Sequence, residues 1–305
     1  MIDALRLLFS SFPISLKIRF IWFFKNIYFM SWSKPRKLKL SKESNKSDRN
    51  QIWSSFEGHF KFVSEYYKPK NILNSPMVQE TMYGSFAPLH IINKFEIKNL
   101  IYSFSRRIDA TFNKGDSSLG WLSLFGALLE RCEELEPGLL ERMRGQNFVE
   151  FGPGLGFAGQ IYSQLFEAKG LNYDLNVVTK VRNLCLKEFN KYNSDLFIEP
   201  EEFESIEELE KKVLSLPQYS FISTWAFTES PINVRNKFEK IIANSNTCLI
   251  VSNKKFSNIS NFKYLQDMSE RLPNHKHLKC DLSFLKNAPS FQQKHQLHLF
   301  ICKNT

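Results

Sequence analysis

From residue 146 onward, short apolar runs alternate with longer stretches whose apolar residues recur every three or four positions. The apolar runs predict strands over residues 147–151, 171–174, 194–198, 219–224 and 247–252. The periodic stretches between them predict helices over residues 157–169, 177–190, 204–214 and 231–244. Because strands and helices alternate, we expect a parallel sheet covered by helices on both faces.

The last two apolar segments have a different pattern. Residues 276–283 and 295–302 alternate apolar and polar side chains, which is typical of strands, and no helical pattern separates them. Consecutive strands joined in this way pair as an antiparallel hairpin. The predicted fold class is therefore α/β, with a Rossmann-like sheet of five parallel strands and a C-terminal antiparallel hairpin.

Upstream of the sheet, the sequence predicts two further regions. Residues 51–145 are mainly helical in pattern; Leu122, Phe125 and Leu129, for example, follow helical spacing. We expect this region to form a helical cap that contributes to substrate binding. Residues 1–50 form a basic, apolar tail and linker, and residues 146–305 form the domain that contains the sheet.

The tail accounts for most of the net charge. The chain carries a formal charge of +10, and residues 1–50 hold eleven basic and three acidic side chains, a net +8. Residues 18–30 are rich in aromatic side chains but too short and too charged for a membrane-spanning helix, which needs about 20 apolar residues. Two interpretations stay open: peripheral contact with the inner face of an anionic membrane, or a helix docked on the protein's own core.

Cysteine and metal-ligand patterns argue against two classes of site. The five cysteines are scattered, without a CxxC pair, so we expect neither a disulfide framework nor a zinc cluster. A reducing, cytoplasmic location fits this usage. Since His, Asp and Glu show no clustering at ligand spacing either, no metal site is predicted.

The strongest chemical signal follows the first predicted strand. Glu150 ends this strand and is followed by Gly152, Pro153, Gly154 and Gly156, after which a helix begins. Glycine allows a sharp turn and a close approach to a ligand, and the helix directs its free N–H groups there. A dinucleotide site needs G-x-G-x-x-G, and Phe157 occupies the last position instead. The alternative is a tight turn without a ligand.

The pattern E-x-G-x-G-x-G resembles motif I of class I S-adenosylmethionine-dependent methyltransferases, whose sheet also ends in an antiparallel hairpin. That resemblance implies that Glu150 and the glycines hold the methionine end of the cofactor. Eighteen residues after Gly156, Asp174 ends the second strand and is followed by Leu175. A carboxylate there can accept both ribose hydroxyl protons. The alternative role for Asp174 is a helix N-cap.

A third segment lies where the fourth predicted strand ends. Ser223 and Thr224 close the strand and are candidate cofactor contacts, and the aromatic Trp225 and Phe227 follow. Glu229 could accept a hydroxyl proton or bind a substrate hydroxyl, because ligands bind at the carboxyl ends of such strands. Its alternative role is a negative charge for the N-terminus of the helix entered after Pro231.

Over residues 120–302 these blocks resemble more closely the sugar O-methyltransferases assigned to bacterial surface-polysaccharide gene clusters. The resemblance rests on motif I, on the Tyr173-Asp-Leu sequence and on residues 221–231. The chain departs from the family at Asn176, where proline is expected, and at Thr228, where serine is expected. These departures bear on the substrate more than on the cofactor.

The sequence therefore predicts an S-adenosylmethionine-dependent O-methyltransferase that acts on a sugar hydroxyl of a glycan or glycolipid in surface-polysaccharide biosynthesis. Candidates for the general base are Glu229 and His90, with His275 and His277 near the end of the sheet. Alternatives are a small-molecule or lipid methyltransferase with the same core and a non-catalytic nucleotide-binding module. Nucleic acid is not an expected partner, because the sheet domain is nearly neutral and has no Asn-Pro-Pro-Tyr after the fourth strand.

Overall fold

The computed structural model describes residues 60–61, 63–65, 67–75, 78, 89–112, 118–256, 258–283 and 295–303. The chain divides into two units, residues 1–48 and 49–305, and every described residue belongs to the second. The predictions for the tail and linker over residues 1–50, including membrane contact, lie outside the described residues. Within the described part of the chain, no helix is long and apolar enough to cross a bilayer.

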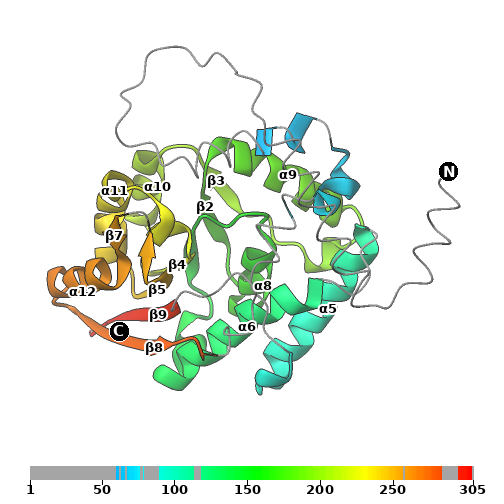
Figure 1. Ribbon diagram of the computed structural model, residues 1–305. Coiled ribbons are helices and arrows are strands. Elements are labelled where there is room, and N and C mark those ends of the chain that lie inside the picture. Colours follow the sequence, from blue (N-terminus) through cyan, green and yellow to red (C-terminus); the bar gives the residue numbers. More distant parts are fainter. Residues whose placement is uncertain are drawn as a thin grey trace, which may run out of the picture. The chain divides into compact units, whose positions relative to one another are not determined.

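The second unit is built on a seven-stranded sheet with the order β3-β2-β1-β4-β5-β9-β8 (Figure 1). The strands are β1 Asn147–Phe151, β2 Gly170–Tyr173, β3 Glu201–Phe203, β4 Tyr219–Thr224, β5 Thr247–Asn253, β8 His275–Asp281 and β9 His295–Cys302. Strands β1 to β5 pair in parallel with their neighbours in this order, whereas β9 runs antiparallel to both β5 and β8. The predicted Rossmann-like sheet with its C-terminal antiparallel hairpin is confirmed.

Helices cover both faces of the sheet (Figure 1). Alternate strand residues point to opposite faces, so Phe148, Ile222 and Leu249 pack in one core, while Val149 and Phe221 pack in the other. The first core is covered by α5 Phe95–Thr111, α6 Ser118–Leu135, α7 Leu139–Met143, α8 Phe157–Phe166 and α9 Asn176–Asn190. The second is covered by α10 Ile206–Val213, α11 Ile232–Ala243 and α12 Asn261–Arg271.

The described part of the predicted cap region is helical and shares the first core. The rings of Trp121 in α6 and Phe157 in α8 lie 6.0 Å apart between centroids. At Gly126, a β-carbon would collide with the side chain of Ile101, so α5 and α6 pack at close range. Helices α5 to α7 are therefore part of the body that supports the sheet, and their role in substrate binding stays a prediction.

One predicted strand is wrong. Residues 194–198 do not join the sheet; Ser194–Leu196 form a short 3-10 helix, η3, and the edge strand is β3. The side chain of Gln160 in α8 donates to the carbonyl of Ile198 at 2.8 Å and accepts its N–H at 3.0 Å. Because that amide satisfies the backbone in place of a neighbouring strand, this apolar run packs on α8 without belonging to the sheet.

Between β5 and β8 the chain forms elements that the sequence pattern did not predict. A small hairpin, β6 Lys255–Phe256 with β7 Ile259–Ser260, leads into α12. Helix α12 buries Tyr264, Leu265 and Met268 against the second core. It completes the helical cover beside β5.

Candidate active site at the carboxyl edge of the sheet

The glycine-rich turn after β1 is tightly enclosed on two sides and open on the third. Gly152, Gly154 and Gly156 have φ angles of +69°, +57° and +80°, a region that favours glycine. A β-carbon at Gly152 would collide with that of Ala226, and one at Gly156 would lie 2.8 Å from Cδ of Arg182. At Gly154 a β-carbon would meet nothing within 4 Å. The turn therefore presents Gly154 to open space.

Glu150 lies beneath this turn. Its side chain points to the α8 face, where Gly159 leaves just enough room for the carboxyl group. The residue is buried, and within the described residues its Oε2 atom has no hydrogen-bond partner. Burial raises the pKa of Glu150 to about 8 against the opposing charge of Arg182. A buried carboxyl oxygen of this kind either carries a proton or accepts from a donor outside the described residues.

Asp174 follows β2 and faces the same turn. Its Oδ1 accepts the N–H of Leu175 at 2.8 Å, and its Oδ2 accepts the N–H of Gly154 at 3.2 Å. Arg182 donates to the same Oδ2 at 3.1 Å. Leu175 is the N-cap residue of α9, and no side chain caps that helix, so Asp174 is not the N-cap that the alternative role required. Burial raises the pKa of Asp174, opposed first by Arg182 and then by the two backbone donors.

The loop after β4 meets the glycine-rich turn at the point where the strand order reverses, between β1 and β4. Ser223 links the two, because its hydroxyl donates to the carbonyl of Phe151 and accepts the N–H of Phe227, both at 3.0 Å. Its contacts are thus within the protein, while Thr224 is half-buried at the end of β4. Open α/β sheets bind ligands at such a reversal of strand order.

Trp225 begins this loop in a strained conformation. Its φ of +68° is rare for a bulky residue, and its N–H donates to the carbonyl of Val251 at 3.0 Å. The indole Nε1 donates to Nδ1 of His295 at 3.0 Å, which leaves the ring proton of a neutral His295 on Nε2. Burial lowers the pKa of His295 to about 4, so this ring is neutral at pH 7. Strain of this kind is concentrated at functional sites.

Glu229 lies at the end of η4 (Ala226–Glu229), above β5. The side-chain amide of Asn253, the last residue of β5, donates to its Oε1 at 2.8 Å. Burial raises the pKa of Glu229 to about 7, although the bond from Asn253 and the charge of Arg235 oppose the shift. Helix α11 has no acidic residue in its first turn. A carboxyl group that titrates near neutral pH is suited to accept a proton from a substrate.

The structure does not bring His90 to this loop. His90 is exposed on η2 (Leu89–Ile91), which packs on α6. The next backbone N–H groups, of Asn93 and Lys94, bond to Glu130 in the C-terminal half of α6. The N-terminal half of that helix is the part that contacts Phe157 beside the turn. His90 as general base stays a prediction, and its placement does not pair it with Glu229.

The other two histidines of the prediction lie on β8. His275 contacts the carbonyl of Ser245 at 2.9 Å, at the edge where the parallel strands begin. The ring of His277 stacks on Phe300 with 4.4 Å between centroids. The histidine that does contact the loop after β4 is His295, at the start of β9.

Three residues of the site were missed in the sequence: Arg182, Asn253 and His295. Arg182 falls among the apolar positions of the predicted helix 177–190. A cation on the buried face of a helix could have identified it as a residue of the site. Asn253 directly follows an apolar strand, the same position that identified Asp174. His295 carried no signal, because its contact with Trp225 joins residues 70 positions apart.

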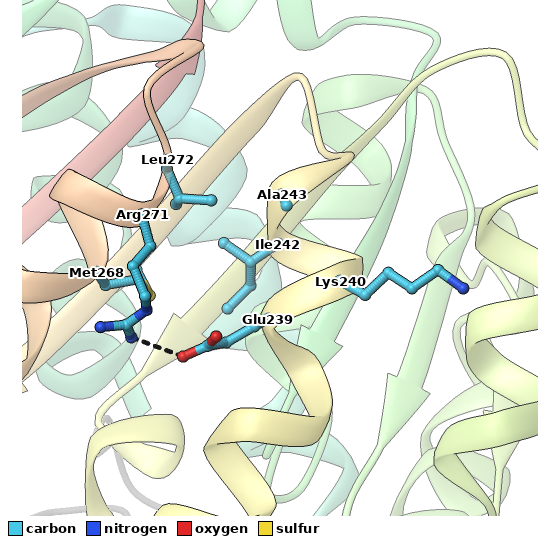
Figure 2. A pocket seen from close by; sticks show the side chains of 7 residues that line it. All are labelled: Glu239, Lys240, Ile242, Ala243, Met268, Arg271 and Leu272. Carbon is cyan, nitrogen blue, oxygen red and sulfur yellow. Dashed lines mark hydrogen bonds and ion pairs between the residues drawn. The ribbon is translucent and has the colours of Figure 1, made fainter.

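A separate hollow of about 240 Å³ lies between the C-terminal ends of α11 and α12 (Figure 2). It is lined by Glu239, Lys240, Ile242, Ala243, Met268, Arg271 and Leu272. The ion pair between Glu239 and Arg271, at 2.6 Å, crosses its rim. Since α11 ends just before β5 begins, this hollow lies at the opposite edge of the sheet from Glu229.

Within the described residues, no group of three or more His, Cys, Asp or Glu could hold a metal ion.

No family model matches the chain, and no curated protein matches it. Solved structures similar to it include magnesium protoporphyrin IX methyltransferase (ChlM) from Synechocystis PCC 6803 with bound SAM, at 10% identity and a TM-score of 0.40 over 78% of this chain and 99% of that one. The methyltransferase domain of bacterial CtHen1 is similar at 11% identity and a TM-score of 0.40, over 57% of this chain and 99% of that one. TrmK from M. capricolum in complex with S-adenosylhomocysteine is similar at 13% identity and a TM-score of 0.37, over 56% of this chain and 70% of that one. These values assign neither an activity nor a substrate.

Proposed function

We propose that the protein is an S-adenosylmethionine-dependent O-methyltransferase. The observation that carries the proposal is the meeting of three segments at the reversal of strand order: the glycine-rich turn, Asp174 after β2 and Glu229 after β4. We call residues 150–156 with Asp174 the cofactor side, and residues 225–229 with Asn253 the acceptor side. Ser223 joins them through its two hydrogen bonds.

The cofactor side fits such a nucleoside ligand in two respects. Gly154 faces open space that a side chain would fill, and Glu150 has a buried oxygen without a partner in the described residues. In this proposal Glu150 and the turn bind the methionine end, and Asp174 binds the ribose. When bound, S-adenosylmethionine supplies an electrophilic methyl group on a sulfonium ion. The protein contributes alignment of the acceptor oxygen, which accounts for much of the rate in such a displacement.

The acceptor side supports a hydroxyl substrate. A sugar hydroxyl is a weak nucleophile. A positioned general base typically raises the rate of such a reaction by roughly 10²- to 10⁴-fold. The raised pKa of Glu229, about 7, lets its carboxylate hold the hydroxyl proton near neutral pH. The side-chain amide of Asn253 donates to Oε1 of this carboxylate and stabilises its charged form. The residue pattern at 221–231 favours a sugar of a glycan or glycolipid; a small-molecule or lipid hydroxyl is the second candidate.

The proposed reaction is tested with S-adenosylmethionine labelled in its methyl group. The protein is incubated with bacterial surface glycans lacking methyl groups, with lipid-linked sugars and with small phenols and alcohols. We expect label in the sugar fraction, removed by Glu229→Gln and retained by Glu239→Gln at the distant hollow. Label found only on the nitrogen of amino sugars, or in the phenol fraction alone, would reject the sugar hydroxyl as the substrate.

A further inference from the structure

Arg182 is a fully buried arginine that bonds to both parts of the cofactor side. Its Nη1 donates to the carbonyl of Gly154 at 3.0 Å and to Oδ2 of Asp174 at 3.1 Å. Its Nε and Nη2 donate to the two carboxyl oxygens of Glu202 in β3, at 2.9 and 2.5 Å, and Nη2 also donates to Thr179 at 2.9 Å. All five N–H donors of the guanidinium are therefore used.

This arrangement fixes the direction of the Asp174 carboxylate. An ionised carboxylate has about four acceptor positions. Three are filled here, by Leu175, Gly154 and Arg182. Because Arg182 is held from the opposite side by Glu202, it cannot rotate with the aspartate, and the remaining acceptor position keeps one orientation. The charge of Arg182 also opposes protonation of the buried Asp174, which preserves its capacity to accept.

The glycine-rich turn depends on the same side chain. At Gly156 a β-carbon would lie 2.8 Å from Cδ and 3.1 Å from Cγ of Arg182. The turn thus packs on the aliphatic part of the arginine while Gly154 accepts from its head group. One residue in α9 therefore couples the turn after β1 to the aspartate after β2 and to the edge strand β3.

We infer that Arg182 is a positioning residue of the nucleoside site: it orients Asp174 so that its one free acceptor position, on Oδ1, meets the 2′-hydroxyl of the cofactor ribose. This inference rests on the proposed function. It adds a specific statement, namely that the contribution of Arg182 to affinity depends on the hydroxyl groups of the ligand.

The test is a mutant cycle on the full-length protein by calorimetric titration. The variants are wild type and Arg182→Lys, and the ligands are S-adenosylhomocysteine and its 2′-deoxy analogue. For S-adenosylhomocysteine we expect Arg182→Lys to weaken binding by roughly 10- to 100-fold, the usual effect of losing hydrogen bonds to a charged group. For the 2′-deoxy analogue the loss should be smaller by at least about 5-fold, because the hydroxyl that Asp174 would accept is missing.

Two further variants keep the result decisive. Arg235→Lys changes the other fully buried arginine, and we expect equal effects on both ligands, which separates loss of stability from loss of positioning. Thr179→Val removes one partner of Arg182 and keeps the charge; it decides the question if Arg182→Lys does not fold. We expect from it a loss of roughly 3- to 10-fold with the natural ligand, again smaller with the analogue.

Equal losses for the two ligands, in whichever Arg182 or Thr179 variant folds, would overturn the inference. Failure of the wild-type protein to bind S-adenosylhomocysteine at all would instead overturn the proposed function. The two failures are therefore distinguishable in one set of titrations.

Discussion

The cofactor side and the acceptor side are each held by one fully buried arginine, but the two arginines use different partners. Arg182 is bonded to two carboxylates, Asp174 and Glu202. Although burial lowers the pKa of its guanidinium, the hydrogen bonds that it donates to Glu202 and the charges of the nearby carboxylates outweigh that effect and raise the pKa. The charges on the cofactor side are therefore compensated within the protein.

Arg235, in α11, is bonded to neutral groups on the acceptor side. It donates to the carbonyls of Thr228 and Ser230 and to the amide oxygen of Asn261. Burial lowers its pKa to about 10, and the charges of Tyr264 and Glu229 oppose that shift. The difference indicates that charged partners hold the guanidinium of Arg182 on the cofactor side, while neutral partners hold that of Arg235 beside Glu229, whose carboxyl group titrates near pH 7.

Among changes that separate the two sides, Glu229→Gln is expected to have the largest effect. Losing a general base should lower kcat by roughly 10²- to 10⁴-fold while the affinity for S-adenosylhomocysteine stays unchanged. In the wild type, kcat should rise with pH through about 7, because the base must be ionised and burial raises its pKa to that value. Rate measurements between pH 5 and 9 check both statements; a flat wild-type profile would remove Glu229 from the proton transfer.

Gly152→Ala should break the junction between the two sides. The new β-carbon would require a positive φ of +69° and would collide with Ala226. Strain and overpacking together should lower the free energy of unfolding by about 2–5 kcal/mol. Gly145→Ala is the matched control, since its φ is +75° but its β-carbon would meet nothing within 4 Å. Urea unfolding of both variants measures the difference, and equal losses would contradict the close approach of turn and loop.

Glu150→Gln tests the compensation on the cofactor side. The pKa of Glu150 in the folded protein, about 8, is above its value in the unfolded chain. Between roughly pH 4.5 and 8 the folded form holds a proton that the unfolded form has released, so stability falls as pH rises, by up to about 1.4 kcal/mol per pH unit.

Glutamine cannot titrate, so this slope should become shallower in Glu150→Gln by the contribution of Glu150, while the contributions of Asp174 and Glu229, whose pKa values are also raised, remain. The exposed Glu141→Gln should keep the wild-type slope. Thermal or urea unfolding at several pH values measures both. The same slope in wild type and Glu150→Gln would show that another group carries it.

The smallest expected effect is that of Asn253→Leu. Its amide bond to Oε1 of Glu229 stabilises the charged form, so removing it should raise the pKa of Glu229 further. At pH 7 the rate should fall by roughly 3- to 10-fold, the effect of one typical hydrogen bond on the pKa of the base, and should recover at pH 9. A rate that stays low at pH 9 would indicate a role for Asn253 other than supporting the carboxylate.

The sequence predicted the sheet well because the spacing of apolar residues and the positions of glycines both depend on local backbone conformation. Strands β1, β4 and β9 have the predicted bounds, and the antiparallel hairpin was predicted from alternation and the short loop between its two segments. The run 194–198 failed because Gln160, 38 positions earlier in the chain, satisfies the backbone of Ile198 in a way that no local pattern reports. A tertiary contact replaced the expected strand pairing.

The site was predictable where a residue follows a strand directly. Glu150 and Asp174 were found at the ends of their predicted strands and Glu229 in the loop after the fourth, and Asn253 could have been found in the same way. His295 and the strained backbone of Trp225 could not, since their contact depends on β9 lying beside β5. Arg182 reaches Glu202 and Gly154 from a different helix, so its role becomes visible only when the three segments are folded together.

The central claim is that the turn around Gly154 binds an S-adenosyl nucleoside, and calorimetric titration with S-adenosylhomocysteine tests it most directly. Wild type and Gly145→Arg, whose glycine also has a positive φ and open space, should bind one equivalent. Gly154→Arg, which places a side chain in the space that Gly154 faces, should bind none. No heat of binding from the wild type, or equal binding by Gly154→Arg, would contradict the account.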